Sequence, residues 1–268
     1  MIYLYIFLSA VILLLLYMRF EAGFLKVKRI QFTKDHRGLK IAHLSDIHIN
    51  RLKVPLSRVI STLERERPDL IIITGDYIEK SYHKEDFLSF LKQIKQDFKI
   101  LMCMGNHDYK AFPDDKEGLG AFIHDIKNTG VIVLRNNSIC IEKNSKKYNI
   151  IGLEDLRLGN PDIDKAIRSC CKGSFMNIGI SHNPDIVMEM PHDKIDYLFC
   201  GHFHGGQIWA PFNLEFKILR RDRLCRMGIK HGLHKINGIT LYINKGLGNV
   251  VVPLRFLSRP EISIYHMP

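Results

Sequence analysis

Five short hydrophobic stretches of the sequence each end in a cluster of polar side chains that could bind metal ions. The clusters are DIH at 46–48, GD at 75–76, GNHD at 105–108, SHN at 181–183 and GHFH at 201–204. They combine Asp, Asn and His without cysteine, a set of ligands that suits Mn²⁺, Fe or Zn²⁺. Side chains alternate along an extended chain, so the two ligands of DxH, like those of HxH, point to the same side. We therefore predict that the clusters form one metal site.

The position of the clusters supports this prediction, because each one follows an expected strand. Ligands of α/β sheets bind at the carboxyl ends of the strands. Gly75, Gly105 and Gly201 immediately precede predicted ligands, where we expect a tight turn with positive φ. Taken singly, a residue such as Asp46 is more often a helix cap than a ligand, and His182 could simply sit in a turn. Taken together and in this order, the clusters indicate one shared edge.

The same blocks resemble the signature motifs of the calcineurin-like metallophosphoesterases. DIH, GDY, GNHD, SHNPD and GHFHGGQ carry the resemblance, which spans residues 41 to 206. The later stretch GLGNVVVPLRFLSRPEI resembles the closing segment of a membrane-associated bacterial branch of phosphohydrolases, some of which act as UDP-diacylglucosamine pyrophosphatases. The resemblance implies an α/β fold in which two mixed β-sheets pack as a sandwich flanked by helices, in four layers. It also implies a binuclear centre of two divalent ions, whether Mn, Fe or Zn.

The resemblance further implies a role for each residue that matches a motif. The implied ligands are Asp46, His48 and His204 for one metal, Asn106, His182 and His202 for the other, and Asp76 as a bridge between them. His107 would be the catalytic acid that protonates the leaving group, oriented by a carboxylate such as Asp46 or Asp76. His43 and Asp108 do not match ligand positions, and we expect Asp108 to support its loop.

Such a centre would hydrolyse phosphoester or pyrophosphate bonds. The carboxylates of Asp46 and Asp76 neutralise only half of the charge of two divalent ions, and the remaining charge favours a bound phosphate. Paired metals activate water and stabilise both the attacking and the leaving oxygen, and a general acid adds roughly 10²–10⁴-fold. One alternative is a silent metal-binding scaffold or a nucleic-acid-binding protein. We disfavour it because all the ligands are present and no aromatic and basic stacking array is found in the sequence.

The substrate is less clearly indicated by the sequence than the reaction. A formal net charge of +11 predicts attraction to an anion such as a phospholipid surface, nucleic acid or a phosphorylated substrate. We expect a membrane-associated lipid phosphate or nucleotide-linked lipid, with soluble nucleotides or phosphoproteins as the alternative, and no specific nucleic acid. Candidate phosphate clamps, or else solvated surface residues, are Arg135, Arg157, Arg220, Arg221, Arg223 and Arg255. Trp209, the only tryptophan, would line the pocket or fill the core.

The N-terminal segment has the composition of a membrane anchor. Residues 1 to 18 contain no charged side chain, and residues 1–20 would form a helix of about 30 Å, the thickness of a bilayer core. No basic residue precedes the segment and no A-x-A site follows it, which favours a retained anchor over a cleaved signal peptide. Arg19, Lys26, Lys28 and Arg29 follow it, so we predict a single-pass protein of the cytoplasmic membrane with its catalytic domain in the cytoplasm. Six cysteines without a CxxC pair agree with a reducing compartment.

The remainder, residues 21–268, is predicted to form one catalytic domain of α/β type. Short runs of Ile, Leu and Val alternate with helical patterns. Expected strands are 25–32, 39–45, 70–74, 99–104, 147–153, 177–181, 196–200, 239–243 and 261–266, and expected helices are 55–67, 83–96, 117–129, 161–171 and 184–190. The chain from about 205 onward has fewer helical patterns, which suggests that it supplies a second sheet packed on the first.

Overall fold

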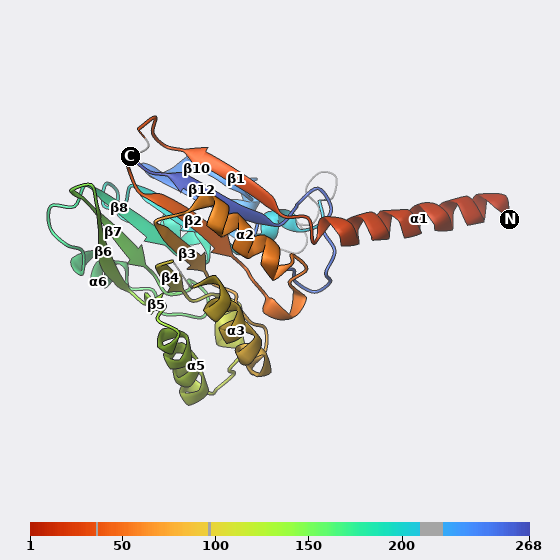
Figure 1. The fold of residues 1–268 in the computed structure, drawn as a ribbon, viewed down its shortest axis with the longest axis horizontal. Helices are drawn as coiled ribbons and strands as arrows, with labels where there is room; N and C mark the ends of the chain where they lie inside the picture. Colours follow the sequence, from red (N-terminus) through yellow and green to blue (C-terminus); the bar gives the residue numbers. More distant parts are fainter. Residues whose placement is uncertain (36, 96–97, 210–221) are drawn as a thin grey trace.

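The computed structural model describes residues 1–35, 37–95, 98–209 and 222–268 (Figure 1). Two six-stranded mixed sheets form the body. In the first, the strands lie in the order β1 (Lys26–Gln31), β12 (Glu261–His266), β2 (Lys40–Ser45), β3 (Leu70–Thr74), β4 (Ile100–Cys103) and β5 (Ile132–Val133). In the second, the order is β10 (Gly232–Ile236), β11 (Ile239–Ile243), β9 (Tyr197–Cys200), β8 (Met176–Ile180), β7 (Lys146–Gly152) and β6 (Asn137–Lys143).

The strands that carry the polar clusters run parallel within each sheet. In the first sheet β2, β3, β4 and β5 are parallel neighbours, and β12 joins β2 in antiparallel fashion. In the second sheet β7, β8, β9 and β11 are parallel, with β6 and β10 antiparallel at the two edges. Because parallel strands end at the same edge, each sheet presents its loops together at one end.

Helices cover the outer face of each sheet, which gives four layers (Figure 1). On the first sheet lie α2 (Leu56–Glu66), α3 (Lys84–Ile94) and α5 (Lys116–Asn128); on the second lie α6 (Ile163–Arg168), the 3-10 helix η3 (Pro184–Met188) and α8 (Arg223–Arg226). Alternate residues of a strand such as β3 pack into two different hydrophobic cores. Ile73 packs under the helices, for example, whereas Ile72 packs between the sheets against residues such as Phe199.

Short helices occupy the loops at the carboxyl ends of the strands. These are η1 (Ile49–Arg51), η2 (Ser81–His83), α4 (Asn106–Lys110) and η4 (His204–Gly206). Three of them begin at a predicted metal ligand or directly after one. The loops therefore turn back immediately after the strands, and their side chains stay near the edge of the sheets.

Helix α1 (Ile2–Glu21) projects away from the body (Figure 1), and its side chains are largely exposed. With 20 residues it is long and apolar enough to cross a membrane; a signal sequence near an N-terminus has the same properties. At its base Met18 and Glu21 are buried against the domain. The helix is thus a candidate membrane span that is attached to the domain at its last turn.

All nine expected strands and the helices α2, α3 and α5 are present within a few residues of their expected bounds. The expected helix 161–171 shortens to α6, and 184–190 is the 3-10 helix η3. The prediction that the chain after about residue 205 supplies the second sheet is wrong. That sheet begins with β6 and β7, well before residue 205, and the last strand β12 returns to the first sheet. Three strands were missed: β5 has only two residues, and β6 and β10 are half-buried edge strands without an apolar run.

Candidate metal centre

The seven predicted ligands lie together where the carboxyl ends of the two sheets meet. Asp46 and His48 follow β2, Asp76 follows β3 and Asn106 follows β4 in the first sheet, whereas His182 follows β8 and His202 and His204 follow β9 in the second. The main-chain N–H of His202 donates to both carboxylate oxygens of Asp46, at 3.1 and 3.0 Å, so the two edges are bonded directly. All seven side chains are buried.

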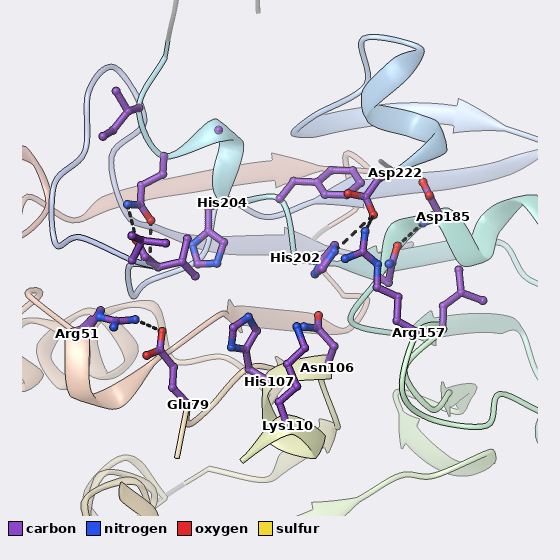
Figure 2. A pocket seen from close by; sticks show the side chains of 18 of the residues that line it. Arg51, Glu79, Asn106, His107, Lys110, Arg157, Asp185, His202, His204 and Asp222 are labelled. Atoms are coloured by element: carbon purple, nitrogen blue, oxygen red, sulfur yellow. Dashed lines mark hydrogen bonds and ion pairs between the residues drawn. The ribbon is translucent and has the colours of Figure 1, made fainter. Parts of the chain in front are cut away.

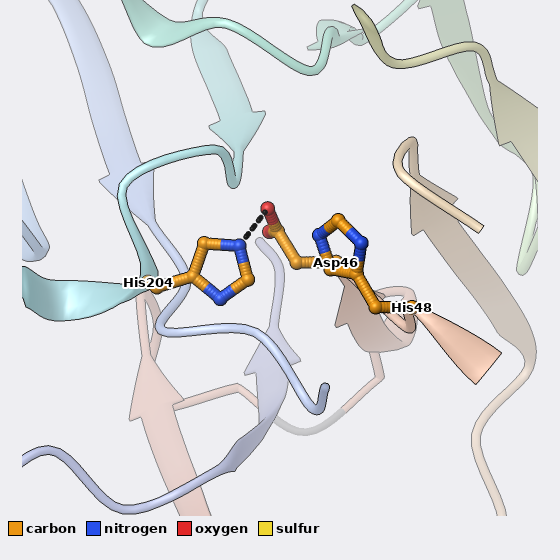
Figure 3. A group of neighbouring side chains, drawn as sticks. All are labelled: Asp46, His48 and His204. Carbon is orange, nitrogen blue, oxygen red and sulfur yellow. Dashed lines mark ion pairs between the residues drawn. The ribbon is translucent and has the colours of Figure 1, made fainter. Parts of the chain in front are cut away.

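Asp46, His48 and His204 form the first group (Figure 3). His204 Nε2 lies 3.1 Å from Asp46 Oδ1, and the other carboxylate oxygen accepts a hydrogen bond from Ser45 Oγ at 2.6 Å. The imidazole rings of His48 and His204 have their centroids 5.1 Å apart. One carboxylate and two imidazoles therefore converge within the span of a single coordination sphere.

Asp76, His182 and His202 form the second group. His182 Nε2 lies 3.1 Å from Asp76 Oδ2 and 3.0 Å from His202 Nδ1. On its other side, His182 Nδ1 donates to the main-chain oxygen of Thr74 at 2.9 Å. A carbonyl can only accept, so this bond fixes the proton on Nδ1 of the neutral ring and leaves the lone pair of Nε2 directed at the group. Orientation of a ligand histidine by a carbonyl is common in metal sites.

Asp76 connects the two groups. Its Oδ2 also lies 3.6 Å from His48 Nε2, so one carboxylate faces a histidine of each group. Within the part of the chain that the structure describes, neither buried ring nitrogen of His48, nor Oδ1 of Asn106, has a hydrogen-bond partner. Buried polar atoms are nearly always satisfied. A pair of divalent ions would satisfy these atoms, and the mixed N and O donors suit such ions. The residues present therefore fit two metals.

The backbone at these ligands is strained. Asp46, His48, Asp76, His202 and His204 all have positive φ, at 49°, 39°, 56°, 74° and 51°. Residues other than glycine adopt such angles uncommonly and at a cost of about 1–3 kcal/mol each, typically at functional sites. This strain agrees with a site in which the side chains are positioned for a ligand.

Two glycines are required by the close approach of the loops. A Cβ on Gly201 would lie 1.8 Å from Ser45 Oγ and 2.2 Å from Asp46 Oδ2, and one on Gly105 would lie 2.3 Å from the nitrogen of Asp76. Neither glycine has a positive φ, so the reason given from the sequence for these two residues is wrong; of the three glycines it holds only for Gly75, with φ 74°.

The electrostatics of the centre favour a positive charge between the carboxylates. Burial alone would raise the pKa of Asp46 and of Asp76, but the neighbouring histidines hold both pKa values below the usual range. For His182, burial lowers the pKa, yet Asp76, Asp46 and Asp155 outweigh it and raise the pKa to about 10. Burial lowers the pKa of His48 to about 3, so this ring is neutral. Metal ions require deprotonated ligands and would supply the positive charge that protonated His182 otherwise provides.

Asp108 and His43 behave as expected for residues outside the ligand set. Asp108 accepts main-chain hydrogen bonds from Gly105, Asp76 and Tyr77 at 2.7 to 2.9 Å, and so supports the loop. Burial, and then the charge of Asp76, raise its pKa to about 8. His43 bonds Tyr265 through Nδ1 and Thr74 through Nε2, at 2.8 and 2.7 Å.

A cavity of about 1370 Å³ opens onto the centre, lined by Asn106 and His107 on one side and by His202 and His204 on the other (Figure 2). His107 is only half-buried, and its ring lies 5.1 Å from that of His48. Its main-chain N–H donates to Asp76 Oδ1 at 2.8 Å. The carboxylate that groups with its ring nitrogens is that of Glu79, which also pairs with Arg51.

Several lining residues were missed from the sequence. Glu79 and Lys110 lie shortly after the GD and GNHD clusters but are not part of them. Asp222 lies far along the chain from every cluster, yet is 3.5 Å from His202 Nε2. The candidate phosphate clamps separate into classes. Arg157 and Arg223 line the cavity, Arg135 pairs with Glu154, Arg255 is fully buried among main-chain oxygens, and Arg220 and Arg221 lie outside the described residues. Trp209 neither lines the cavity nor fills the core, since it is 45% exposed.

Comparison with known proteins agrees with this geometry. A family model described as calcineurin-like phosphoesterase matches residues 39–206. The chain is 30% identical over 234 residues to the uncharacterized metallophosphoesterase YkoQ of Bacillus subtilis, covering 86% of this chain and 84% of that protein. It is 28% identical to the phosphodiesterase YaeI of Escherichia coli, covering 89% and 86%. It is 27% identical to the UDP-2,3-diacylglucosamine pyrophosphatase LpxG of Chlamydia trachomatis, covering 91% and 89%. The chain therefore belongs to the calcineurin-like phosphoesterase family and is a metal-dependent phosphoesterase.

Proposed function

We propose that this enzyme hydrolyses a phosphoester or pyrophosphate bond of a membrane lipid or nucleotide-linked lipid, with two divalent ions bound at the groups described above. The observation that carries the proposal is the pair of adjoining groups, Asp46–His48–His204 and Asp76–His182–His202, at the base of a large cavity. Asn106 is proposed as a further ligand of the second group, because it lines the same cavity as His202 and its buried Oδ1 lacks a hydrogen-bond partner in the described chain.

The chain's own residues divide the remaining work. Two ions, when bound, would lower the pKa of water and neutralise the charge on the phosphorus oxygens. His107 faces the cavity and is proposed to donate a proton to the leaving oxygen as the phosphorus–oxygen bond breaks and the bond to the water oxygen forms. Glu79, grouped with His107 and His48, would hold the protonated imidazole in place. Lys110 and Arg157, both in the cavity wall, are proposed to bind the rest of the anionic substrate.

The substrate class rests on three supports. The relative LpxG is named for a nucleotide-linked lipid, α1 is long enough to cross a bilayer, and valines line part of the cavity wall. The basic residues after α1 favour a cytoplasmic domain, and the cysteines described as free agree with this placement. The relative YaeI, named only as a phosphodiesterase, keeps a soluble nucleotide or phosphoprotein as the second candidate.

The test is a hydrolysis assay on the full-length protein purified in detergent and loaded with Mn²⁺, which follows the release of p-nitrophenol or of the nucleoside monophosphate. Wild type should cleave bis-p-nitrophenyl phosphate, and a chelator should abolish the activity. Micellar CDP-diacylglycerol, which carries a pyrophosphate, is compared with soluble UDP-sugar at equal concentration. Faster turnover of the soluble compound would refute the lipid assignment, and inactivity on every phosphorylated compound with fewer than two metals bound would refute the reaction.

A further inference from the structure

Large hydrophobic side chains are exposed around the base of α1. We call this set the apolar collar. Its members are Phe20, Phe24, Trp209, Val251, Val252 and Leu257, with exposed fractions of 63%, 44%, 45%, 79%, 41% and 57%. They come from three segments far apart in the sequence. In Figure 1 the segment after β11 loops out of the body beside the base of α1. Contiguous exposed hydrophobic surface of this kind marks contact with a partner or a membrane.

Hydrogen bonds tie this loop to the last turn of α1. The N–H of Arg255 donates to the main-chain oxygen of Met18 at 3.1 Å, and the N–H of Leu257 donates to Glu21 Oε2 at 3.0 Å. The ring of Phe256, between them, packs edge-on against Tyr17 with centroids 6.1 Å apart. The loop is therefore held at the level where α1 leaves the domain.

Trp209 belongs to the same assembly. Its main-chain N–H donates to the main-chain oxygen of Phe256 at 3.0 Å. The main-chain N–H of Phe256 in turn donates to the main-chain oxygen of Gln207 at 2.9 Å. The side-chain amide of Gln207 donates to the main-chain oxygens of Val250 and Val252, both at 2.9 Å. The side chain of Gln207 thus fixes the segment 250–252 next to Trp209.

The backbone of the loop is strained so that hydrophobic side chains face outward. Val251 and Leu257 have φ of 59° and 56°. A β-branched residue with positive φ is a genuine outlier, and such strain is typically found at functional sites. Burial within this chain does not account for it, because both side chains are more than half exposed.

We propose that the apolar collar inserts into the interface of the same bilayer that α1 spans, and that it seats the mouth of the catalytic cavity on the lipid surface. The proposal rests on the membrane placement of α1 in the proposed function. A 20-residue helix is about 30 Å long and fills the hydrocarbon core, so its last turn lies at the interface. The collar, bonded to that turn, lies at the same depth.

The surrounding charges suit an anionic lipid surface. Arg19 and Lys26 flank the collar and are exposed. The guanidinium of Arg259 stacks on the ring of Phe24, 3.9 Å from its centroid, and donates to the main-chain oxygens of Phe24 and Leu25. Aromatic rings and basic side chains together are characteristic of the membrane–water interface.

The collar is continuous with the cavity, which defines the class of substrate. Val251 and Val252, together with Val250 and Ile208, line the same cavity as His107. An amphiphile could therefore place its phosphate at the metal groups while its acyl chains remain in the bilayer along these valines. The substrate would be a lipid phosphate taken directly from the membrane surface, with no need to leave it.

Trp209 is the only tryptophan of the chain, so its fluorescence reports on the collar without any mutation. Full-length protein is reconstituted into phosphatidylcholine vesicles with and without bromine on the acyl chains. We expect brominated lipid to quench the emission, and iodide in the water to quench it less than in the urea-unfolded protein. The proposal would be overturned if brominated lipid left the Trp209 emission unchanged and iodide quenched it as strongly as in the unfolded protein. This test does not depend on catalysis.

A matched pair of variants tests the consequence for turnover. Leu257 does not line the cavity, and asparagine tolerates its positive φ, so Leu257→Asn makes the collar polar with little strain. Leu233→Asn on β10 is the control, because Leu233 is 52% exposed outside the collar. Leu257→Asn should lower turnover of CDP-diacylglycerol in vesicles about tenfold, as expected for one hydrophobic side chain, and leave bis-p-nitrophenyl phosphate unchanged.

The outcomes separate the collar from the proposed function. An equal loss on both substrates, or no loss on either, contradicts the collar. Wild-type protein that is inactive on both substrates contradicts the proposed function, and the fluorescence experiment then decides on the collar alone.

Discussion

Replacing Arg255 by lysine should destabilise the enzyme strongly, although the side chain does not line the cavity. Arg255 is fully buried, and burial lowers its pKa only to about 10, so it remains charged at neutral pH. Its guanidinium donates hydrogen bonds of 2.5 to 3.2 Å to Asn249 Oδ1 and to the main-chain oxygens of Lys245, Gly246, Gly248 and Ser258.

The magnitude follows from the number of acceptors. A lysine ammonium has three donors at one point and leaves at least two of the five acceptors unsatisfied. Each buried acceptor without a partner costs about 1–3 kcal/mol, which gives a loss of about 4 kcal/mol in the free energy of unfolding. For a domain of this size that loss lowers Tm by about 10 °C.

The centre should respond as well. The same loop donates from Gly248 N to the main-chain oxygen of Asp46 at 2.7 Å and from Leu247 N to that of Ser45 at 2.9 Å. Arg255→Lys should therefore lower the metal content. Thermal unfolding of the detergent-purified protein, with metal analysis, measures both effects. Arg259→Lys is the control, since Arg259 is partly exposed and bonds only two described main-chain oxygens. A Tm within about 2 °C of wild type would show that this reasoning is wrong.

Three further predictions concern the centre and the buried His43 near it. Gly201→Ala places a Cβ 2.2 Å from Asp46 Oδ2 and should abolish metal binding, whereas Gly120→Ala, in α5 with open space around it, should not; metal analysis compares them. Burial lowers the pKa of His43 to about 3. Below pH 6.5 this histidine is therefore protonated in the unfolded chain but stays neutral in the folded state. Stability should therefore fall by about 2 kcal/mol at pH 5, and His43→Gln should show a shallower loss in urea titrations. Asp76→Ala should lose metal pairing, whereas His107→Ala should keep both metals and lose roughly 10²–10⁴-fold in kcat; unchanged kcat would exclude His107 as the acid.

The sequence predicted the parts of the fold that depend on strong local patterns. The buried strands β2 to β4, β8 and β9 are rich in apolar residues, and the clusters that follow them come together as expected. The edge strands β6 and β10 were missed because half-buried strands carry no such run. Their position relative to one sheet or the other is a tertiary property that periodicity does not encode.

The residues missed at the site share a different cause. Glu79 and Asp222 become neighbours of the ligands only through the folding of their loops, and neither lies in a motif. The fate of Arg255 illustrates the same limit, because an arginine read as a solvated surface residue or a phosphate clamp is a buried centre of hydrogen bonds. Spacing along a strand predicts which side chains share a face, but loop packing decides which distant residues join them.

Each ligand group draws on both sheets: Asp46 and His48 meet His204 across the sandwich, as Asp76 meets His182 and His202. Ions bound there would act as cross-links that clamp one end of the two layers together, while the opposite end is held by apolar packing and by polar contacts such as the hydrogen bond from Tyr148 Oη to the main-chain oxygen of Pro268, at 2.6 Å. Because ligands that bind only the folded state stabilise it by mass action, a chelator should loosen the molecule unevenly. Amide exchange would then accelerate first in the loops after β2, β3, β8 and β9, and last in the strands around Tyr148 between the sheets.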